Sequence, residues 1–308
     1  MTPDPPIGWE LYRSFLGVLK EGSLSGAARA LGVTQPTVGR HIAALEKSLK
    51  LVLFTRSPTG LLPTEAALAL QTHAESMEST AAALERTAAS QGAGIRGVVR
   101  ITASDVIGVE VLPTVLARLH HEHPDLKIEL VLTNRVQDLL RREADIAVRM
   151  TPPRQETLIA RRIGRIEVGL HASRQYLAAQ GTPGNIAELA QHTLIGFDQE
   201  TAFIRSARKA LPVMSREKFS LRTDSDLAQL ALIRAGAGIG ACQVPIAKRS
   251  DTLVRVLQRQ VAFYLETWIT MHEDLRNRPS CHVTFEALVS GLQQHVAAAK
   301  SSFWRRNG

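Results

Sequence analysis

One stretch decides the fold of the N-terminal part of this chain: AARALGVTQPTV, residues 27–38. Gly32 suits the left-handed backbone at which helices often end. Thr34 follows as an N-cap candidate, and Pro36 stands in the first turn, where its missing N–H does no harm. The stretch therefore predicts two helices joined by a short turn, which is the helix-turn-helix arrangement.

The flanking residues complete a small helical unit. An apolar stripe of helical period runs over residues 9–19, and Ser23 is the N-cap candidate of a short second helix. Apolar residues at helical spacing predict a third helix over residues 35–49. Residues 53–63 then predict two short strands around a turn of proline and glycine, which together form a wing.

The polar face of the third predicted helix gives this unit a candidate function. Side chains in its first two turns can donate and accept hydrogen bonds at base edges or phosphates in a DNA major groove, and an arginine in the wing can reach a phosphate. We expect the DNA-binding residues to be Ser23, Ser25, Thr34, Gln35, Pro36, Thr37, Val38, Arg40, His41 and Arg56. For each residue alone a solvated polar position is the alternative, but the ordered set of caps, turn and wing favours DNA binding.

The next segment predicts one long helix. Thr64 is its N-cap candidate, and residues 65–91 contain neither glycine nor proline. Apolar residues alternate along it at spacings of four and three, the narrow seam of a two-helix coiled coil. We expect a dimer seam formed by Leu70, Ala74, Met77, Ala81, Leu84 and Ala88. The alternative is a single helix packed on its own domain. Residues 91–94 then break the helix as a hinge.

From residue 97 onward, strands and helices alternate, which is typical of a doubly wound α/β domain. We expect strands at residues 98–101, 127–132, 144–148, 162–171, 193–197, 241–244 and 262–271, and helices at residues 111–120, 136–142, 187–191, 226–235 and 287–299. The predicted fold class is therefore α/β, preceded by a mostly helical winged unit.

Ligands of α/β sheets bind beyond the carboxyl ends of the strands. The residues at these ends are therefore candidates for a binding pocket: Ser104, Asp105, Thr133, Asn134, Arg149, Phe197, Asp198 and Ser225. Arg149 can form a bidentate pair with a ligand carboxylate, or instead a salt bridge with a neighbour such as Asp145 or Asp198. Ser104 can bind an anionic ligand or simply cap the following helix.

Length and composition exclude several classes of protein. The 308 residues suggest two or three globular units, and a hydrophobic content of 44% is too high for a disordered chain. No apolar run approaches the roughly 20 residues that span a bilayer. The first residues do not form a basic segment followed by an apolar run, so we expect no secretory signal. Cys242 and Cys281 lie far apart, which fits reduced thiols in a cytosolic protein.

The formal net charge of +8 is unevenly distributed. Residues 1–64 contain seven basic and four acidic residues, and residues 65–91 contain one basic and four acidic residues. These charges of +3 and −3 cancel, so the whole excess belongs to residues 92–308. In that part of the chain it indicates either an anionic ligand or a basic surface near DNA.

Motifs for other functions are incomplete. The glycines of residues 236–240 follow a helix and precede a strand, the reverse of the order in a dinucleotide-binding fingerprint, so we interpret them as a helix stop. The histidines of residues 120–123 lack a second cluster that would complete a metal site. No P-loop, GxSxG or HExxH motif occurs. We expect a protein that is not an enzyme, with no catalytic residue, no metal and no cofactor besides a small-molecule effector.

The N-terminal motifs resemble the winged helix-turn-helix of LysR-type transcriptional regulators. The resemblance rests on the pattern of residues 27–46, on Leu53-Phe54-x-Arg56 and on Pro63-Thr64-Glu65-Ala66. It implies that residues 35–43 lie in the major groove of DNA. Gly39 stands where the family usually has serine, which removes the side chain from one contact and weakens the helix by roughly 0.5–1 kcal/mol relative to alanine.

The resemblance extends over nearly the whole chain and implies three parts. They are a winged domain at residues 1–64, a linker helix and hinge at residues 65–94 that pairs two subunits, and an effector-binding domain at residues 95–302. The last part is similar to two periplasmic-binding-protein-like α/β subdomains that close over a small molecule. Subdomain I is expected at about residues 95–164 and 268–302, subdomain II at about residues 165–267, and two crossing segments near residues 165–168 and 264–268.

The sequence therefore predicts a sequence-specific DNA-binding transcriptional regulator, an activator or repressor controlled by a small anionic metabolite in the C-terminal cleft. The expected partners are double-stranded DNA, the effector, further copies of the chain in a dimer or tetramer, and RNA polymerase. The expected location is the cytoplasm, at the nucleoid, without membrane contact. Two alternatives stay open: a ligand-independent DNA-binding protein, and a solute-binding or enzymatic α/β protein with an appended helix-turn-helix.

Overall fold

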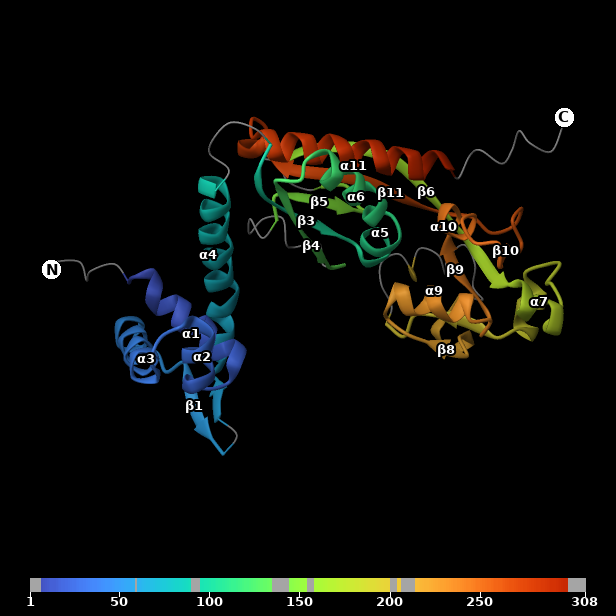
Figure 1. The fold of residues 1–308 in the computed structure, drawn as a ribbon. Coiled ribbons are helices and arrows are strands. Elements are labelled where there is room, and N and C mark those ends of the chain that lie inside the picture. Colours follow the sequence, from blue (N-terminus) through green and yellow to red (C-terminus); the bar gives the residue numbers. More distant parts are fainter. Residues whose placement is uncertain are drawn as a thin grey trace. The chain divides into compact units, whose positions relative to one another are not determined.

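The computed structural model of the chain describes residues 7–58, 60–89, 95–134, 144–153, 158–199, 204–205 and 214–298. Within these residues the chain forms two compact units, the first ending at Ala88 and the second beginning at Ala89 (Figure 1). The expected hinge at residues 91–94 and the expected helix at residues 136–142 lie outside the described residues.

The first unit is a winged helix-turn-helix followed by a long helix. Its elements are α1 (Trp9–Glu21), α2 (Leu24–Leu31), α3 (Gln35–Leu49), the antiparallel strands β1 (Phe54–Ser57) and β2 (Gly60–Pro63), and α4 (Glu65–Ala89). Gly22 and Gly32 end α1 and α2 in the left-handed conformation, which the sequence predicts for Gly32. The hydroxyl of Ser23 caps α2 by accepting a hydrogen bond from Gly26 N at 3.0 Å. These local signals fix the turn of the motif.

One core holds the first unit together. It buries Phe15, Leu16, Val18, Ala27, Val38, Leu45 and Leu53, among others. The wing is fixed to the end of α1 because Leu61 N donates to the carbonyl oxygen of Gly22 at 2.8 Å. A Cβ on Gly60 would meet that same oxygen at 2.5 Å, so only glycine fits there. The Glu46 carboxylate accepts from Leu53 N at 2.7 Å and holds the segment between α3 and the wing.

The second unit is built on one nine-stranded sheet. Its order is β4 (Leu126–Leu132), β3 (Gly97–Ala103), β5 (Ile146–Arg149), β11 (Phe263–His272), β6 (Leu158–Ser173), β9 (Ile239–Gln243), β7 (Leu194–Gly196) and β8 (Leu221–Arg222), with β10 (Leu253–Arg255) paired to β6. β6 and β11 are antiparallel and coincide with the two segments expected to cross between the subdomains. They join two halves, one with the parallel strands β3, β4 and β5 and the other with the parallel strands β7, β8 and β9.

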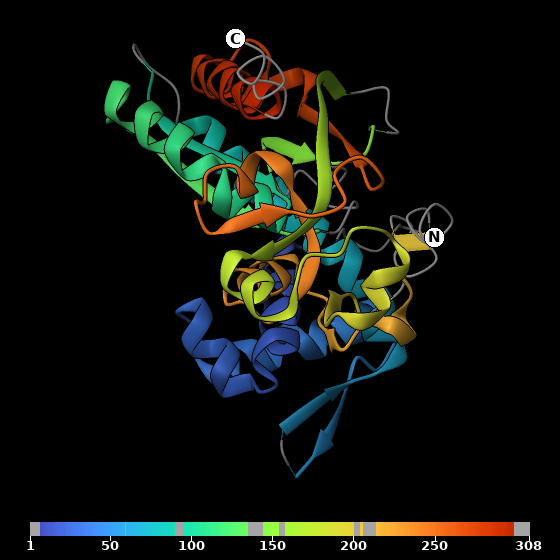
Figure 2. The ribbon, with the colours of Figure 1, turned by 90° about the vertical axis from the view of Figure 1, so that its right-hand side faces the viewer.

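Helices cover each half of the sheet. The first half contains α5 (Asp105–Glu110), α6 (Leu112–Glu122), η4 (Glu273–Leu275) and α11 (Pro279–Ala298), and the second contains α7 (Arg174–Gln180), η2 (Ala187–Gln191), η3 (Arg216–Lys218), α9 (Asp226–Arg234) and α10 (Val244–Ala247). α11 packs on β3, β6 and β11 and lies beside α6 (Figures 1 and 2). Each half buries its own apolar core, so the predicted α/β architecture with two subdomain-like halves is confirmed.

Some element boundaries differ from the prediction. The last helix begins at Pro279, eight residues before its expected start. The prediction missed its first turns because they bury polar residues, which interrupt the apolar pattern. Thr284 is one of them, and its hydroxyl donates to the Ser280 carbonyl at 2.7 Å. The strand expected at residues 241–244 ends at Gln243, since Pro245 places Val244 at the start of α10. The helix expected at residues 187–191 is a 3-10 helix.

Gly236 adopts the left-handed conformation, with φ of 80°, directly after α9. This agrees with a helix stop rather than a nucleotide-binding turn. None of the helices in the described ranges is long and apolar enough to cross a membrane.

Candidate functional sites

The start of α3 presents the candidate DNA-binding face. Most residues predicted for it are exposed or half-buried: Ser25 on α2, Thr34, Gln35, Pro36, Thr37, Arg40 and His41, and Arg56 in the wing. Thr34 does not cap α3, because its hydroxyl lies 2.8 Å from the hydroxyl of Thr37. Arg40 Nη2 in turn donates to Thr37 at 3.5 Å. These contacts gather three polar side chains on one exposed surface.

Three residues predicted for this face have structural roles. Val38 is fully buried, so its prediction as a DNA contact is wrong: it lies on the apolar stripe of α3 that packs on the core. The Ser23 hydroxyl is used by the cap of α2. Nδ1 of His41 lies 2.7 Å from the hydroxyl of Ser14, a buried residue of α1, so the imidazole ties α3 to α1.

Gly39 faces open space on α3. A Cβ at this position would have one neighbour within 4 Å, Leu24 Cδ1 at 3.8 Å, which is an ordinary van der Waals contact. Its φ is not in the left-handed region, so neither space nor backbone conformation requires glycine.

The predicted dimer seam of α4 divides into two parts. Ala74 is 2% exposed and packs with Leu70 on the core of the first unit. For Ala74 the prediction of a seam is wrong, because the first turns of α4 pack on their own domain, which was the alternative interpretation. Leu70 is half-buried, and its place in the seam stays a prediction. Exposed or half-buried positions follow further along the helix: Met77, Ala81, Leu84 and Ala88. Met77 and Leu84 are 41% and 66% exposed, so this later part of the stripe is uncovered within the described residues.

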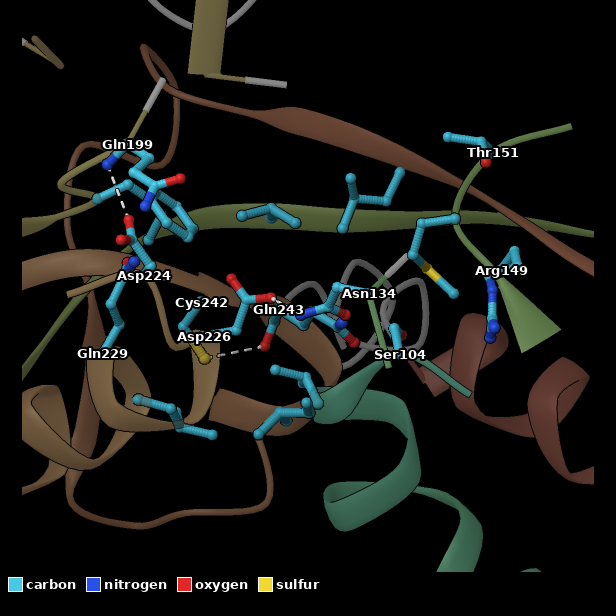
Figure 3. Close-up of a pocket in the computed structure, with 18 residues that line it drawn as sticks. Ser104, Asn134, Arg149, Thr151, Gln199, Asp224, Asp226, Gln229, Cys242 and Gln243 are labelled. Atoms are coloured by element: carbon cyan, nitrogen blue, oxygen red, sulfur yellow. Dashed lines mark hydrogen bonds between the residues drawn. The ribbon is translucent and has the colours of Figure 1, made fainter. Parts of the chain in front are cut away.

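The second unit contains a cavity of about 430 Å³ between its two halves, beyond the carboxyl ends of β3 and β5 (Figure 3). Four predicted pocket residues line it: Ser104, Asn134, Arg149 and Phe197. Val168 of β6 and Leu265 of β11 also line it, so the cavity touches both halves and the strands that join them. A ligand here could therefore favour one arrangement of the two halves.

The other four predicted pocket residues make local contacts instead. Thr133 N donates to the Ala103 carbonyl and extends the pairing of β4 with β3. Ser225 caps α9 by accepting from Ala228 N at 3.2 Å. Asp198 pairs with Arg216 at 2.7 Å, and Asp105 accepts from Asn134 Nδ2 at 3.0 Å. A strand pairing, a helix cap, an ion pair and a hydrogen bond to Asn134 thus engage these four residues.

Arg149 is 6% exposed, and its guanidinium is engaged inside the first half. Nη2 donates to the hydroxyl of Thr102 at 2.9 Å, and Nη1 donates to the carbonyl oxygen of Val148 at 3.0 Å. In Figure 3, Arg149 lies at the opposite end of the pocket from Asp224 and Gln199. These bonds fix the guanidinium in the lining of the cavity, and its bidentate pairing with a ligand carboxylate stays a prediction.

The acidic and amide residues of the cavity were missed by the sequence interpretation. Asp224, Asp226, Gln229 and Gln243 all line it, together with Cys242. Neither aspartate is among the predicted pocket residues, and their place at the start of the helix expected at residues 226–235 was the one available signal. Burial and the nearby Asp105 raise the pKa of Asp226. This lining does not favour the anionic ligand expected from the net charge.

Part of the basic excess lies on the other face of the crossing strands. A second cavity of about 750 Å³ there is lined by Arg165, Arg174, Lys248 and Arg255, with Glu167 and Asp251 among them. Arg255 pairs with Glu167 at 2.6 Å, and the guanidinium of Arg165 lies 5.2 Å from the ring centre of Tyr264. Charges of this cavity thus serve partly to hold β6, β10 and β11 together.

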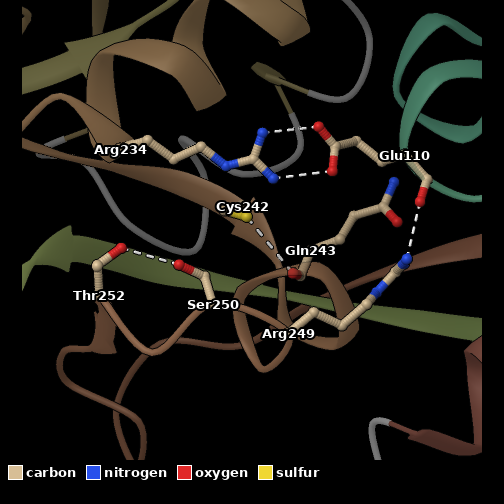
Figure 4. Close-up of polar contacts among 7 residues, drawn as sticks. All are labelled: Glu110, Arg234, Cys242, Gln243, Arg249, Ser250 and Thr252. Atoms are coloured by element: carbon tan, nitrogen blue, oxygen red, sulfur yellow. Dashed lines mark hydrogen bonds and ion pairs between the residues drawn. The ribbon is translucent and has the colours of Figure 1, made fainter.

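An ion pair and a hydrogen bond connect the two halves beside the first cavity (Figure 4). Arg234 of α9 donates to both oxygens of Glu110 of α5, at 2.7 and 2.8 Å. The hydrogen bond from Arg234 is the main reason that the pKa of Glu110 is lowered. Arg249 Nη1 donates to the Glu110 carbonyl at 2.8 Å. These contacts stabilise the arrangement of the two halves seen here.

The described residues show no metal site. They contain no group of three or more histidine, cysteine or acidic residues that could hold a metal ion. Burial raises the pKa of the Cys242 thiol to about 12, so this residue of the cavity is a protonated thiol at neutral pH. Cys281 is buried in the core of the first half.

Comparison with known proteins agrees with this architecture. Residues 9–68 match the family described as "Bacterial regulatory helix-turn-helix protein, lysR family", and residues 92–293 match the "LysR substrate binding domain". An HTH-type transcriptional regulator of Xanthomonas campestris pv. campestris (strain 8004) is 29% identical over 58% of this chain and 52% of that protein. The HTH-type transcriptional activator AaeR of Escherichia coli (strain K12) is 26% identical over 73% of this chain and 74% of that protein. The match thus spans about half the length of the first of these relatives.

Solved structures show the same fold. The full-length structure of the Vibrio cholerae virulence activator AphB has a TM-score of 0.61 at 23% identity and covers 92% of this chain and 99% of that chain. CbnR in complex with its target DNA has a TM-score of 0.65 at 19% identity and covers 95% of this chain and 99% of that chain. Because the two family matches together cover most of its length, the chain belongs to the LysR family of bacterial regulatory helix-turn-helix proteins.

Proposed function

We propose that this protein is a DNA-binding transcriptional regulator whose activity is controlled by a small molecule bound in the cavity of the second unit. The observation that carries the proposal is the polar surface at the start of α3, where hydrogen bonds link the side chains of Thr34, Thr37 and Arg40. In helix-turn-helix proteins this end of the second helix meets base edges in the major groove. The relatives named as transcriptional regulators, and the solved complex of CbnR with its target DNA, support the proposal.

The DNA contacts follow from exposure and chemistry. Gln35 and Arg40 have the donors and acceptors that read base edges, and Arg56 in the wing can neutralise a phosphate. The remaining contacts are Ser25, Thr34, Pro36 and Thr37. Val38 is excluded because it is buried, and His41 acts by fixing α3 on α1.

The assembly and its control complete the proposal. Two chains pair along the uncovered part of α4, as a dimer or a pair of dimers, so that two half-sites on DNA are read together. The effector binds one arrangement of the two halves more tightly than the other, and this difference alone can shift the DNA-bound state. The regulator acts on RNA polymerase at its promoters and works in the cytoplasm at the nucleoid.

The test is a selection of bound duplexes from a random DNA pool, followed by affinity measurements at several salt concentrations. Arg40→Ala should weaken binding to the selected duplex and, if it meets a phosphate, reduce the salt slope by about one unit. Arg161→Ala is the matched control, because Arg161 pairs with Glu286 in the second unit. Recovery of no preferred duplex by the wild-type chain, or unchanged binding by Arg40→Ala at every salt concentration, would contradict the proposal.

A further inference from the structure

The shape and lining of the first cavity restrict its ligand. About 430 Å³ is within the range of small-molecule sites. Its apolar lining comes from both halves and from the crossing strands: Val106, Met150, Val168, Phe197, Leu230, Ala241, Ile246 and Leu265. Water in such a site is readily displaced by apolar groups, so the body of the ligand should be largely apolar.

The carboxylate of Asp226 is placed to receive a positively charged donor. Its nearest hydrogen-bond contact is with Asn134 Nδ2 at 3.5 Å, and the same amide donates to Asp105 at 3.0 Å. Two carboxylates from opposite halves thus share one amide group. No basic side chain of the described residues forms an ion pair with Asp226. Asp224, which also lines the cavity, accepts a hydrogen bond from the backbone N–H of Gln199 at 2.8 Å.

A second buried group supplies the opposite hydrogen-bonding capacity. Gln243 is 7% exposed and lines the cavity. Arg249 Nη2 lies 3.1 Å from Nδ1 of His295, and a guanidinium can only donate, so Nδ1 has no proton and Nε2 has one. Nε2 therefore donates to Oε1 of Gln243 at 3.1 Å. Burial, with Arg249, lowers the pKa of His295 to about 4 and keeps this neutral tautomer at pH 7.

This chain of bonds orients the Gln243 amide. Its oxygen is used by His295, so its NH₂ group is the free end, and no described residue accepts a hydrogen bond from it. Gln229, 2% exposed, is oriented in the reverse sense: its Nε2 donates to the Thr223 carbonyl, which leaves its oxygen as an acceptor in the lining. Among the polar groups of the lining, Asp224, Asp226 and the oxygen of Gln229 can thus accept hydrogen bonds from a ligand, and the NH₂ of Gln243 can donate one.

We propose that the cavity binds a small, largely apolar molecule that carries a protonated amine, with the ammonium group donating to Asp226 and an acceptor atom of the ligand facing the NH₂ of Gln243. An anion in this position would meet two carboxylates, whereas Arg149 already donates to Thr102 and Val148 at the other end of the pocket. The positive charge of an ammonium group also offsets the repulsion between the carboxylates of Asp226 and Asp105, which lie on opposite halves. It therefore favours the approach of the two halves. The inference rests on the proposed function, since it names the class of effector.

The test uses three probes that share a phenyl group and differ in the polar end: phenethylamine, phenethyl alcohol and hydrocinnamate. Binding to the full-length protein is measured by calorimetry and by thermal shift. Phenethylamine should bind at least about tenfold more tightly than hydrocinnamate, the difference expected for a hydrogen bond to a charged group. Asp226→Asn should remove most of this preference. Asp198→Asn should leave it unchanged, because Asp198 lies outside the cavity and pairs with Arg216.

Three results would overturn the inference: equal or tighter binding of hydrocinnamate, an amine preference that survives Asp226→Asn, or no binding of phenethylamine at millimolar concentration. The same protein samples are tested for selective DNA binding. Selective DNA binding without an amine preference would refute the ligand class alone, whereas amine binding without selective DNA binding would refute the proposed regulator and leave the ligand class standing.

Discussion

Glu110 and Arg234 form a bidentate ion pair that joins α5 of the first half to α9 of the second half of the effector-binding unit. The Glu110 side chain is 18% exposed and that of Arg234 is 40% exposed, so water screens the pair on one side. Because the pair spans the two halves beside the cavity, it stabilises one arrangement of them. A ligand that closes the cavity benefits from this pair, and one that opens it must break it.

The interaction free energy of this pair can be measured by a double-mutant cycle of Glu110→Gln and Arg234→Gln. We expect a coupling of about 0.5–1 kcal/mol in the free energy of unfolding, since solvent screening reduces it. The pKa of Glu110 is lowered, so its contribution is present above the ordinary carboxyl pKa of 4.5 and is lost as the pH falls through the folded value. A coupling of zero at low salt, measured by urea denaturation at pH 7, would show that the pair does not hold the two halves.

His171 and His295 should make the second unit sensitive to mild acid. Burial lowers the pKa of each from 6.5 to about 4, so both are neutral in the folded protein at pH 5 while the unfolded chain binds protons. The unfolded state then gains stability as the pH falls from 6.5 towards 4. Each histidine should cost about 2 kcal/mol of folding stability at pH 5 relative to pH 7 or above.

Urea denaturation at the two pH values measures this loss, and His295→Gln tests its source. The variant should lose less stability between pH 7 and pH 5 than the wild type. A control is His121→Gln, because His121 is exposed at the end of α6. If the His295→Gln and wild-type curves shift equally with pH, proton uptake by His295 is not responsible.

The parts of the fold that sequence predicts well are those set by local chemistry. Gly22, Ser23 and Gly32 end and begin helices whatever surrounds them, so the helix-turn-helix could be located residue by residue. The identity of the cavity lining could not be found in this way. Asp226 and Gln243 are distant in sequence from Ser104, and only the approach of the two halves across β6 and β11 makes them neighbours of one cavity.

Errors in the predicted sites have similar causes. Val38 belongs to the apolar stripe that α3 packs on the core. The helical spacing of the apolar residues of α3 therefore excludes Val38 from the DNA contacts. Ala74 lies on a stripe that is continuous with Leu84, so the sequence pattern alone does not show where the domain core ends and free helix begins. Net charge does not locate the charged groups, so the basic excess of residues 92–308 by itself does not decide between an anionic ligand and a basic surface near DNA.

Gly39→Ala should stabilise the first unit. The new Cβ would contact only Leu24 at an ordinary distance, and alanine has a better helix propensity, so we expect a gain of about 0.5–1 kcal/mol. Gly32→Ala is the matched control and should destabilise, because Gly32 has φ of 69°. Urea denaturation followed by circular dichroism gives both values. Destabilisation by Gly39→Ala would indicate that α3 requires glycine for a reason absent from these contacts.

Leu84→Glu should separate the subunits of the proposed dimer. Leu84 is 66% exposed on the part of α4 that extends beyond the core of the first unit, and a charge there would be buried between two paired helices. Leu68→Glu is the control, because Leu68 is also exposed, at 54%. It lies 16 residues before Leu84 on the same helix, which places its side chain roughly 160° around the helix axis from that of Leu84. Sedimentation velocity should show monomers for Leu84→Glu and the wild-type association state for Leu68→Glu. A stable dimer of Leu84→Glu would place the subunit interface elsewhere, and dissociation by Leu68→Glu instead would move it to the opposite face of α4.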